Sequence, residues 1–305
     1  MARKAALFAL KAGVSIALIA WLATRVDPAP ALAAFARLDA GWTALALAIL
    51  GAQLILAGLR WAWIHETLAQ RLAPRDAVAL AFVGQFFNQT LPSAIGGDAV
   101  RAVLAVRLGL TAGQATAGVV LDRGLALVVL VGLMAAGAPL LAAQTGAAHE
   151  AAWLAGFACA GLAVAAAGLG LAARLRRFVP SIRPLDWAFG LAADMRAILV
   201  RPRLLVASLA VHVGVIAAVW ALARALDVPA GFALCAAVVP AIVLLTTLPI
   251  SLAGWGVREG AAIYAFGLAG VDAGDALALS IAFGLAQIAI GAPGLALWLK
   301  GRSGG

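Results

Sequence analysis

Long apolar runs recur along the whole chain and are separated by short polar loops. Eight such runs lie at roughly 5–24, 41–64, 76–92, 113–140, 151–173, 204–226, 230–250 and 274–299, and a ninth, shorter run lies at 257–270. An α-helix needs about 20 residues, at about 1.5 Å each, to cross a hydrocarbon core. A transmembrane β-barrel would instead show alternating segments of about ten residues, and these Ala- and Leu-rich runs do not alternate. The pattern predicts an all-α polytopic membrane protein.

The basic residues between the runs predict how the chain is oriented. Arg3 and Lys4 near one end, and Lys300 and Arg302 near the other, place both termini in the cytoplasm, because short cytoplasmic loops are enriched in Lys and Arg. The strongest such signal is the loop that contains Arg174, Arg176, Arg177, Arg183, Arg196, Arg201 and Arg203. The loop 142–150 contains no Lys or Arg and is expected to face outward.

These basic loops cannot all face the cytoplasm if every run crosses the membrane. Two segments must turn back within the membrane if the arginine-rich loop is to lie on the same cytoplasmic face as Arg101 and Arg107. We therefore predict that 76–107 enters from the cytoplasm and returns, and that 230–270 does the same from the outside. Six full spans and two re-entrant hairpins result. Each hairpin tip predicts a cavity, because irregular backbone at this depth must be surrounded by protein or water.

An internal repeat supports the two hairpins. Residues 90–101 (TLPSAIGGDAVR) align without gaps with residues 247–258 (TLPISLAGWGVR) and share Thr, Leu, Pro, the second Gly, Val and Arg. Two halves, each with three spans and one hairpin, are inverted relative to each other, and in such repeats the interrupted helices mark the binding site. The halves would cover about 1–140 and 151–300 of a single transmembrane domain, 1–302, with a flexible tail at 303–305. A chance likeness between two Gly- and Pro-containing apolar strings is the alternative.

The composition narrows the class of protein further. Of 305 residues, 65% are apolar and 11% are charged, with a mean hydropathy of +1.06, whereas a soluble domain has about a quarter charged residues. The net charge of +9 fits arginine-rich cytoplasmic loops better than nucleic-acid binding. Cys159 and Cys235 lie in apolar runs without metal-site spacing, so neither a metal nor a cofactor is expected. No phosphate loop, zinc pattern or Ser-His-Asp arrangement with plausible context occurs, so we do not expect an enzyme.

Charged residues within the apolar part of the chain are candidates for function. A charge near the bilayer centre costs about 2.5 to 3.5 kcal/mol, so each one needs a partner, water or a role. Asp122 and Arg123 lie about 15 Å deep at 1.5 Å per residue and, as neighbours, point about 100° apart, so they are not expected to pair with each other. Their available partners on the predicted hairpins are Asp98, Arg101, Arg258 and Glu259. A buried charge network that only joins the two halves is the alternative.

The predicted hairpin tips have features of an anion site. Both turns are rich in glycine and lead into short helices, whose N-termini present free N–H groups and partial positive charge. Arg101 and Arg258 fall in the first turns of these helices, where a guanidinium can bind a phosphate through two hydrogen bonds. Asn88, in a polar stripe on the descending arm, and Trp255, in the second turn, complete the candidate binding residues. Alternatively, the arginines extend to the membrane interface and the stripe bonds to a neighbouring helix.

Two further groups of residues are expected at the membrane surface. Tryptophans near the ends of the predicted helices are expected to be interface anchors, and Arg60 lies beside one of them, Trp61. These tryptophans are Trp21, Trp42, Trp61, Trp63 and Trp298. The stretch 185–199 places Trp187, Leu191, Met195 and Ile198 on one helical face. This predicts a helix that lies on the cytoplasmic surface.

Three of these motifs also occur in a known family. Residues 91–101 (LPSAIGGDAVR), 120–124 (VLDRG) and 248–259 (LPISLAGWGVRE) resemble the transmembrane, flippase-like region of lysylphosphatidylglycerol synthases, and the Arg60-Trp61 pair also fits. The resemblance implies a lipid-translocating role, like that of the membrane half of the multiple peptide resistance factor. It points to Asp98, Arg101, Asp122, Arg123, Arg258 and Glu259. The full-length synthase carries a soluble aminoacyl-transferase domain after its membrane region and this chain stops at Gly305, so we do not expect it to make lysyl-lipid.

The sequence therefore predicts a lipid flippase-like transporter of a bacterial-type inner membrane. Its expected partner is a membrane lipid with an anionic or phosphate-bearing head group, held in a midplane cavity between the two halves. A second copy of the chain, or an enzyme of lipid synthesis, is a further partner left open. The alternatives are a proton-coupled transporter of a small polar solute, using Asp122 or Glu259, and a non-transporting scaffold for a lipid-modifying enzyme.

Overall fold

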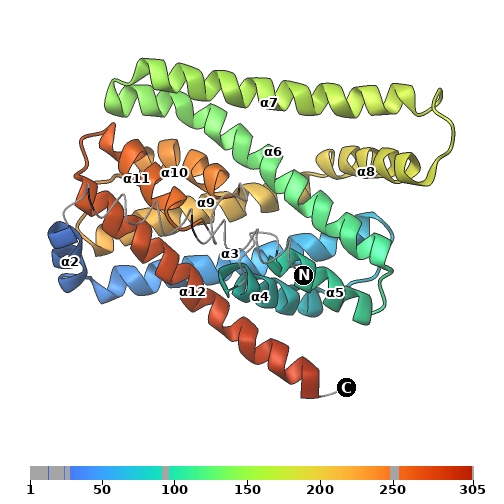
Figure 1. Ribbon diagram of the computed structural model, residues 1–305, viewed down its shortest axis with the longest axis horizontal. Coiled ribbons are helices and arrows are strands. Elements are labelled where there is room, and N and C mark those ends of the chain that lie inside the picture. Colours follow the sequence, from blue (N-terminus) through green and yellow to red (C-terminus); the bar gives the residue numbers. More distant parts are fainter. Residues whose placement is uncertain (1–12, 14–23, 25–27, 91–95, 248–253, 304–305) are drawn as a thin grey trace.

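The described part of the chain is entirely helical. The computed structural model describes residues 13, 24, 28–90, 96–247 and 254–303, and no strand occurs among them. The helices are α2 (Pro28–Ala36), α3 (Ala40–Thr67), α4 (Pro74–Thr90), α5 (Gly96–Arg107), α6 (Ala112–Thr145), α7 (Ala148–Leu175), α8 (Arg183–Leu199), α9 (Pro202–Ala225), α10 (Phe232–Thr247), α11 (Val257–Gly267) and α12 (Ala273–Ser303). Figure 1 shows α3, α7 and α9 along the long axis of the molecule, with α6 and α12 crossing obliquely.

Five of these helices are long and apolar enough to cross a membrane. They are α3, α6, α7, α9 and α12, and they coincide with the predicted runs at 41–64, 113–140, 151–173, 204–226 and 274–299. The remaining predicted span, 5–24, lies outside the described residues except for Gly13 and Thr24. The multi-pass membrane class is therefore confirmed.

Local sequence sets several helix boundaries. Asp39 begins α3 by accepting the N–H of Trp42 at 2.8 Å, as Asp does at many helix N-termini. Thr111 and Gln114 form a reciprocal pair of side-chain hydrogen bonds at the start of α6, and Gly146, at φ +70°, ends it. The two neighbouring long helices α6 and α7 are therefore joined by a very short turn and run antiparallel (Figure 1).

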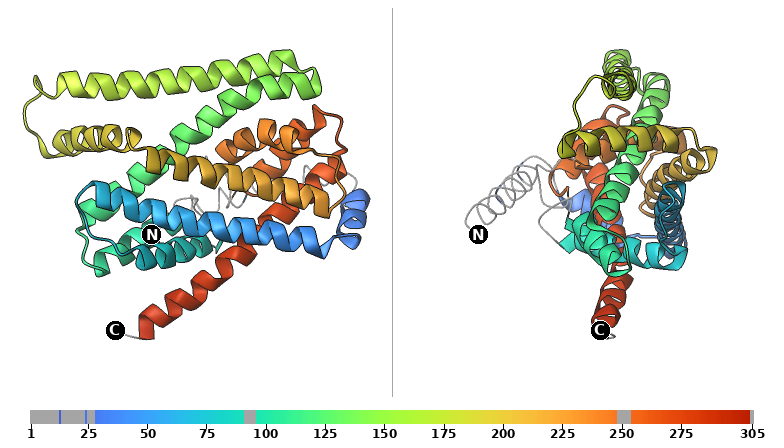
Figure 2. Two further views of the ribbon diagram at one scale, coloured as in Figure 1. Left: turned by 180° about the vertical axis from the view of Figure 1, so that it is seen from behind. Right: turned by 90° about the vertical axis from the view of Figure 1, so that its right-hand side faces the viewer.

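Two pairs of shorter helices open at opposite ends of the molecule. Helices α4 and α5 have 17 and 12 residues, and α10 and α11 have 16 and 11, so none reaches across about 30 Å of hydrocarbon at about 1.5 Å per residue. The first pair starts where α3 ends and returns to where α6 begins. The second starts where α9 ends and returns to where α12 begins (Figures 1 and 2). The predicted tips, 92–98 and 249–256, lie outside the described residues except for 96–98 and 254–256.

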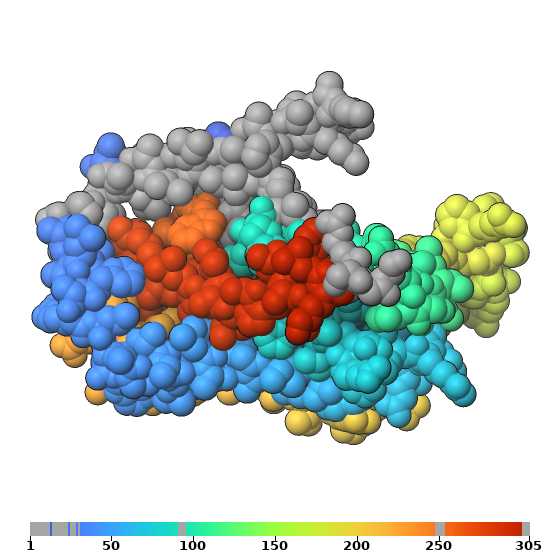
Figure 3. All heavy atoms as spheres, turned by 90° about the horizontal axis from the view of Figure 1, so that it is seen from below, coloured from blue at the N-terminus to red at the C-terminus, as the bar shows by residue number. Residues whose placement is uncertain are grey.

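Helix α12 packs against both pairs. Figure 3 shows it crossing one face of the molecule, from α2 to the α4–α5 pair. A Cβ at Gly291 would lie 3.2 Å from Cα of Phe86, so the α12 and α4 backbones are in close contact there. Gln85 of α4 also donates to the side chain of Gln287 of α12 at 3.0 Å. Residues near the start of α12 instead pack against α11.

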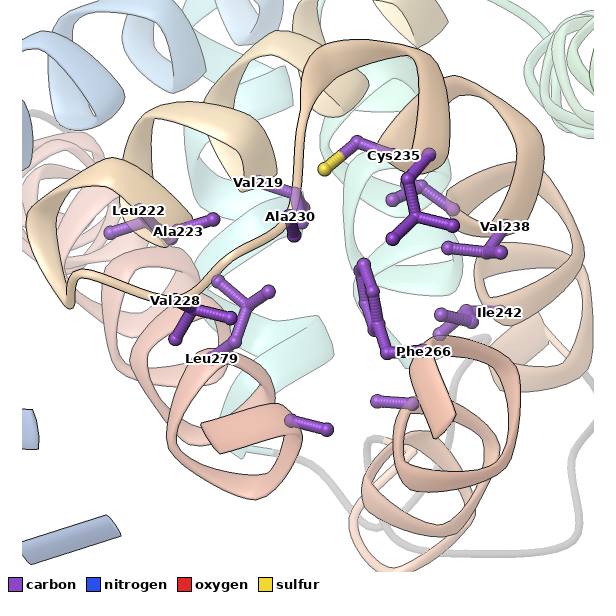
Figure 4. Packing of buried hydrophobic residues seen from close by; sticks show 14 of the residues in the cluster. Val219, Leu222, Ala223, Val228, Ala230, Cys235, Val238, Ile242, Phe266 and Leu279 are labelled. Carbon is purple, nitrogen blue, oxygen red and sulfur yellow. The ribbon is translucent and has the colours of Figure 1, made fainter. Parts of the chain in front are cut away.

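The largest apolar core lies between α9, α10, α11 and α12. Figure 4 shows Phe266 of α11 among side chains of α10, with Leu279 of α12 nearby. Both side chains are 1% exposed. Val228 and Ala230, in the loop between α9 and α10, point into the same core, which fixes the course of that loop (Figure 4).

Helix α8 matches the predicted surface helix in position but not fully in exposure. Ile198 is fully buried, with Leu191 and Met195 packed around it, and Trp187 remains 46% exposed. Its apolar face therefore lies partly on α6 and α9 rather than only on a membrane surface.

Charge separates the two ends of the bundle. Where α3 and α5 end and α9 begins, the basic residues are Arg71, Arg75, Arg107, Arg174, Arg176, Arg177, Arg183, Arg196, Arg201 and Arg203. We call this the basic end. At the opposite end, Arg37 and Arg224 accompany Asp39, Glu150, Asp227, Asp272 and Asp275.

Candidate functional site

Asp122 is the centre of a buried charge cluster formed by four helices. Its Oδ1 accepts Nε of Arg60 at 2.9 Å, and its Oδ2 accepts Nη2 of Arg101 at 3.0 Å. Arg60 also donates from Nη1 to Ser208 of α9 at 2.9 Å. Side chains from α3 and α5 therefore meet at the carboxylate of α6, and Arg60 links this group to α9; Asp122 is only 4% exposed.

Asp98 extends this cluster toward the surface. Arg123 donates to it through two hydrogen bonds, from Nε at 2.7 Å and from Nη2 at 3.0 Å. The side chain of Arg123 is 51% exposed, whereas that of Asp98 is 6% exposed. Asp122 and Arg123 thus take different partners, as expected from their adjacent positions on one helix. We call Arg60, Asp98, Arg101, Asp122, Arg123 and Ser208 the first cluster.

The first cluster carries unsatisfied positive charge. Its three guanidinium groups face two carboxylates, so one positive charge is in excess. Nε of Arg101 lies 3.0 Å from Oδ1 of Asp98 but is not aligned for a hydrogen bond. This buried N–H has no hydrogen-bond acceptor among the described residues. A buried donor without an acceptor is costly, and an anion would satisfy it.

The Trp61 ring packs against the guanidinium group of Arg101. The guanidinium carbon lies 4.7 Å from the centroid of the Trp61 ring, within the range of a cation–π contact. Trp61 is 0% exposed and Arg60 is 4% exposed, so the interpretation of this pair as an interface anchor is wrong. The apolar run at 41–64 ends just after these two residues, which suggests a helix end at the interface. In the structure α3 continues to Thr67, and both side chains are buried in the bundle.

The second pair of short helices carries a smaller cluster of the same kind. Arg258 donates from Nη2 to Oε1 of Glu259 at 2.8 Å and from Nε to Ser280 of α12 at 3.2 Å. Oε2 of Glu259 accepts the N–H of Gly256 at 2.6 Å. The ring of Trp255 lies 4.5 Å from the guanidinium carbon of Arg258. We call Trp255, Arg258, Glu259 and Ser280 the second cluster.

The family assignment follows from the whole chain. The family model for the lysylphosphatidylglycerol synthase transmembrane region matches residues 8–294, which is nearly the full length. The chain belongs to this family. No curated protein matches the sequence. The resemblance inferred from the three motifs is therefore confirmed, and it supports a lipid-related function in the membrane.

In this member of the lysylphosphatidylglycerol synthase transmembrane family, the predicted site residues separate into two groups. Asp98, Arg101, Asp122 and Arg123 meet in the first cluster, and the last three predicted residues meet in the second: Trp255, Arg258 and Glu259. No ion pair joins the two clusters among the described residues. The predicted pairing between Asp122 and the first hairpin is therefore found, and no described ion pair links it to the second.

Asn88 has a structural contact in this conformation. Its Oδ1 accepts the N–H of Gly97 at 2.9 Å, which satisfies one of the free donors at the start of α5. A Cβ at Gly97 would collide with Asn88 and with the carbonyl of Gly84, so α4 and α5 approach closely at this point. Asn88 therefore holds the two arms of the first pair together.

Three contributors were not among the predicted site residues. Arg60 was assigned to the interface, and Ser208 and Ser280 each appear as a single polar residue in an apolar helix. A serine in a span carries little signal, because it often bonds to its own backbone or a neighbouring helix. Arg60 could have been found from its charge within a long apolar run, which by itself demands a partner.

The space beside the second cluster is small. A cavity of about 20 Å³ is lined by Arg258 and Ser280 together with apolar residues that include Phe266. This is room for about one water molecule. A larger pocket, of about 240 Å³, lies between α4, α5 and the last turns of α12, where Arg107 and Trp298 line it. The predicted midplane cavity for a head group is therefore not open at Arg258 in this conformation.

Proposed function

We propose that this protein moves a phosphate-bearing lipid between the leaflets of a bacterial inner membrane. The observation that carries the proposal is the first cluster, with one positive charge in excess, an Arg101 N–H that has no aligned acceptor among the described residues, and a half-exposed Arg123. A phosphodiester supplies the missing negative charge and the missing acceptor, and guanidinium groups bind phosphate through paired hydrogen bonds. Membership of a lipid-related membrane family supports the same substrate class.

The carboxylates of both clusters act as internal substitutes for the phosphate. Asp98 accepts two hydrogen bonds from Arg123, one on each oxygen. Glu259 accepts two hydrogen bonds from Arg258, both on Oε1. Arg258 is buried, and an unpaired buried guanidinium would be strongly destabilising, so these contacts hold the arginines in place while no lipid is present. Lipid binding then exchanges one anion for another, which limits the free-energy difference between the empty and the occupied site.

The two helix pairs are the corresponding parts of two inverted repeats in this proposal. The basic end lies in the cytoplasm, because arginine-rich loops are retained there. The first pair then dips in from the cytoplasmic side and the second from the outside. Motion of one repeat against the other exposes the clusters to the two leaflets in turn.

The hydrogen bonds of the two carboxylates favour a lipid substrate over a small polar solute. Oδ1 and Oδ2 of Asp122 each accept an arginine N–H, and Oε1 and Oε2 of Glu259 accept Arg258 and the Gly256 backbone. All four carboxylate oxygens are therefore occupied by N–H donors of the protein, so neither group presents a free oxygen to a passing solute. This supports a role for the arginines as ligands and for the acids as their partners.

The central test is transfer of fluorescent phosphatidylglycerol in reconstituted vesicles. Arg123→Gln is expected to slow transfer by at least about tenfold, because a hydrogen bond to a charged group contributes about 1.5 to 3 kcal/mol. Arg176→Gln is the matched control, since that side chain is 49% exposed and also pairs with an aspartate, but lies outside both clusters. Equal transfer by the two variants would contradict the proposal. Absence of transfer by the wild-type protein would instead favour the non-transporting scaffold.

A second variant displaces an arginine without changing any charge. A Cβ at Gly284 would collide with Nη2 of Arg258, so Gly284→Ala is expected to push the guanidinium away from Glu259. Because the end of a flexible side chain can move aside, the free energy of unfolding should change by only about 1 kcal/mol. Transfer should nevertheless fall severalfold. Gly132→Ala, where a Cβ would meet nothing within 4 Å, should transfer at the wild-type rate.

A further inference from the structure

A third pocket lies at the end of the bundle opposite to the basic end and shares no lining residue with either cluster. It has a volume of about 370 Å³ and lies where α3 begins, α9 ends and the loop leads into α10. Trp42 and Trp220 line it with edge-to-face rings 5.3 Å apart, and Arg224 lies 5.9 Å from the Trp42 ring. The pocket therefore combines one cation with two amphipathic rings.

The walls of this pocket are fixed by the core. Val228 and Ala230 line it and are each 3% exposed, and Figure 4 shows both among buried side chains such as Leu222 and Leu279. The N–H of Asp39 also donates to the carbonyl of Ala225 at 2.8 Å, which ties the start of α3 to the end of α9. The hollow is therefore built into the packing of three elements.

Arg224 is available to bind an anion. Its side chain is exposed and forms no ion pair with any described residue. Asp39, at the start of α3, accepts the N–H of Trp42 and so caps that helix, and neither Asp39 nor Asp227 forms an ion pair with Arg224. The pocket thus presents a guanidinium without a carboxylate partner.

The other end of the same two helices offers a direct comparison. Arg203 of α9 lies 3.8 Å from the ring of Trp63 of α3, but it also pairs with Glu66 at 3.5 Å. One antiparallel helix pair thus carries an arginine–tryptophan contact at both ends. Only the contact at Arg203 includes an acid.

We propose that the Arg224 pocket binds the phosphate of an anionic phospholipid in the outer leaflet. Tryptophan and arginine at the ends of membrane-spanning helices lie at head-group depth, and the Arg224 guanidinium, which forms no ion pair with a described residue, complements a single phosphodiester. The rings of Trp42 and Trp220, which also line the pocket, suit the glycerol and upper acyl region of the lipid. The role of this pocket as a docking site before or after transfer rests on the proposed function, whereas the binding itself does not.

The test counts lipids that remain bound to the purified full-length protein in native mass spectrometry. The probe is an equimolar mixture of palmitoyl-oleoyl phosphatidylglycerol and phosphatidylcholine. Arg224→Gln is expected to weaken one phosphatidylglycerol site by roughly tenfold, the loss typical of a charge-assisted hydrogen bond, and to reduce the preference over phosphatidylcholine. Arg203→Gln is the matched control and should bind like the wild type. Arg224→Lys, which keeps the charge, should retain most of the preference.

The outcomes separate the alternatives. Unchanged phosphatidylglycerol binding by Arg224→Gln, or an equal loss in Arg203→Gln, would overturn the proposal. Displacement of the lipid by excess inorganic phosphate would also overturn it, because the pocket would then be a site for a free anion. Since binding is measured without transfer, a protein that binds at Arg224 but moves no lipid would refute the proposed function and leave this site in place.

Discussion

Asp122→Asn should destabilise the protein by about 3 to 5 kcal/mol, the cost of removing one partner from a buried ion pair. The substitution leaves Arg60 and Arg101 facing a neutral amide, although both are buried and both bond to the Asp122 carboxylate. Asparagine has nearly the same shape, so the loss reports the charge and not a cavity. The thermal unfolding midpoint in detergent measures it.

Asp186→Asn is the control for this substitution. Asp186 pairs with Arg176 at 2.8 Å, but both side chains are partly exposed, and such a surface pair contributes at most about 1 kcal/mol. Adding Arg60→Gln to Asp122→Asn removes one of the stranded charges and should recover part of the loss, since groups in one network do not act additively. If Asp122→Asn and Asp186→Asn unfold at the same temperature, the first cluster does not hold the helices together.

Gly97→Ala should destabilise the first helix pair by about 3 kcal/mol or more, from overpacking and from loss of a helix cap. The added methyl group would meet the carbonyl of Gly84 and the side chain of Asn88. The obstacle at Gly84 is backbone and cannot rotate away, so α5 must move off α4. The movement would also displace Asp98 and Arg101 on α5, and both unfolding and lipid transfer should respond.

Gly260→Ala is the matched substitution in the second pair. A Cβ there would meet nothing within 4 Å, and alanine favours a helix over glycine by up to about 1 kcal/mol. This variant should be as stable as the wild type or slightly more stable. A similar loss of stability in both variants would show that glycine is needed for some reason other than the approach of α5 to α4.

The sequence predicted the spans well because their signal is local. An apolar run of the right length, such as 113–140, becomes α6 whatever its neighbours are, and the caps at Thr111 and Gly146 can be read directly. Helix α2 at Pro28–Ala36 was not predicted, because nine residues between two apolar runs give no clear period. The burial of α8 against the bundle depends on α6 and α9 and could not be read from its own pattern.

The candidate site was predicted in part, since charge gives a signal that packing does not. Asp122 and Arg123 can be identified because a charge in a span requires a partner. Arg101 follows from the repeat, and Asp98 from its charge on the predicted hairpin. Which of these residues bind each other depends on how α5 lies against α6 and α3. The contact of Trp61 with Arg101 was missed for the same reason, because a tryptophan that packs inside the bundle and one at the membrane interface look alike in sequence.

Helix α12 touches the second cluster through Ser280 and the first helix pair through Gln287 and Gly291. It cannot stay fixed to both pairs if one moves relative to the other. Its contact with α4 combines glycines packed against backbone with the Gln85–Gln287 hydrogen bond, and its contact with the second cluster is made by hydrogen bonds between Ser280 and charged groups. If the two helix pairs shift relative to each other, α12 must therefore give up one of these two sets of hydrogen bonds, and the weaker set decides which pair it follows.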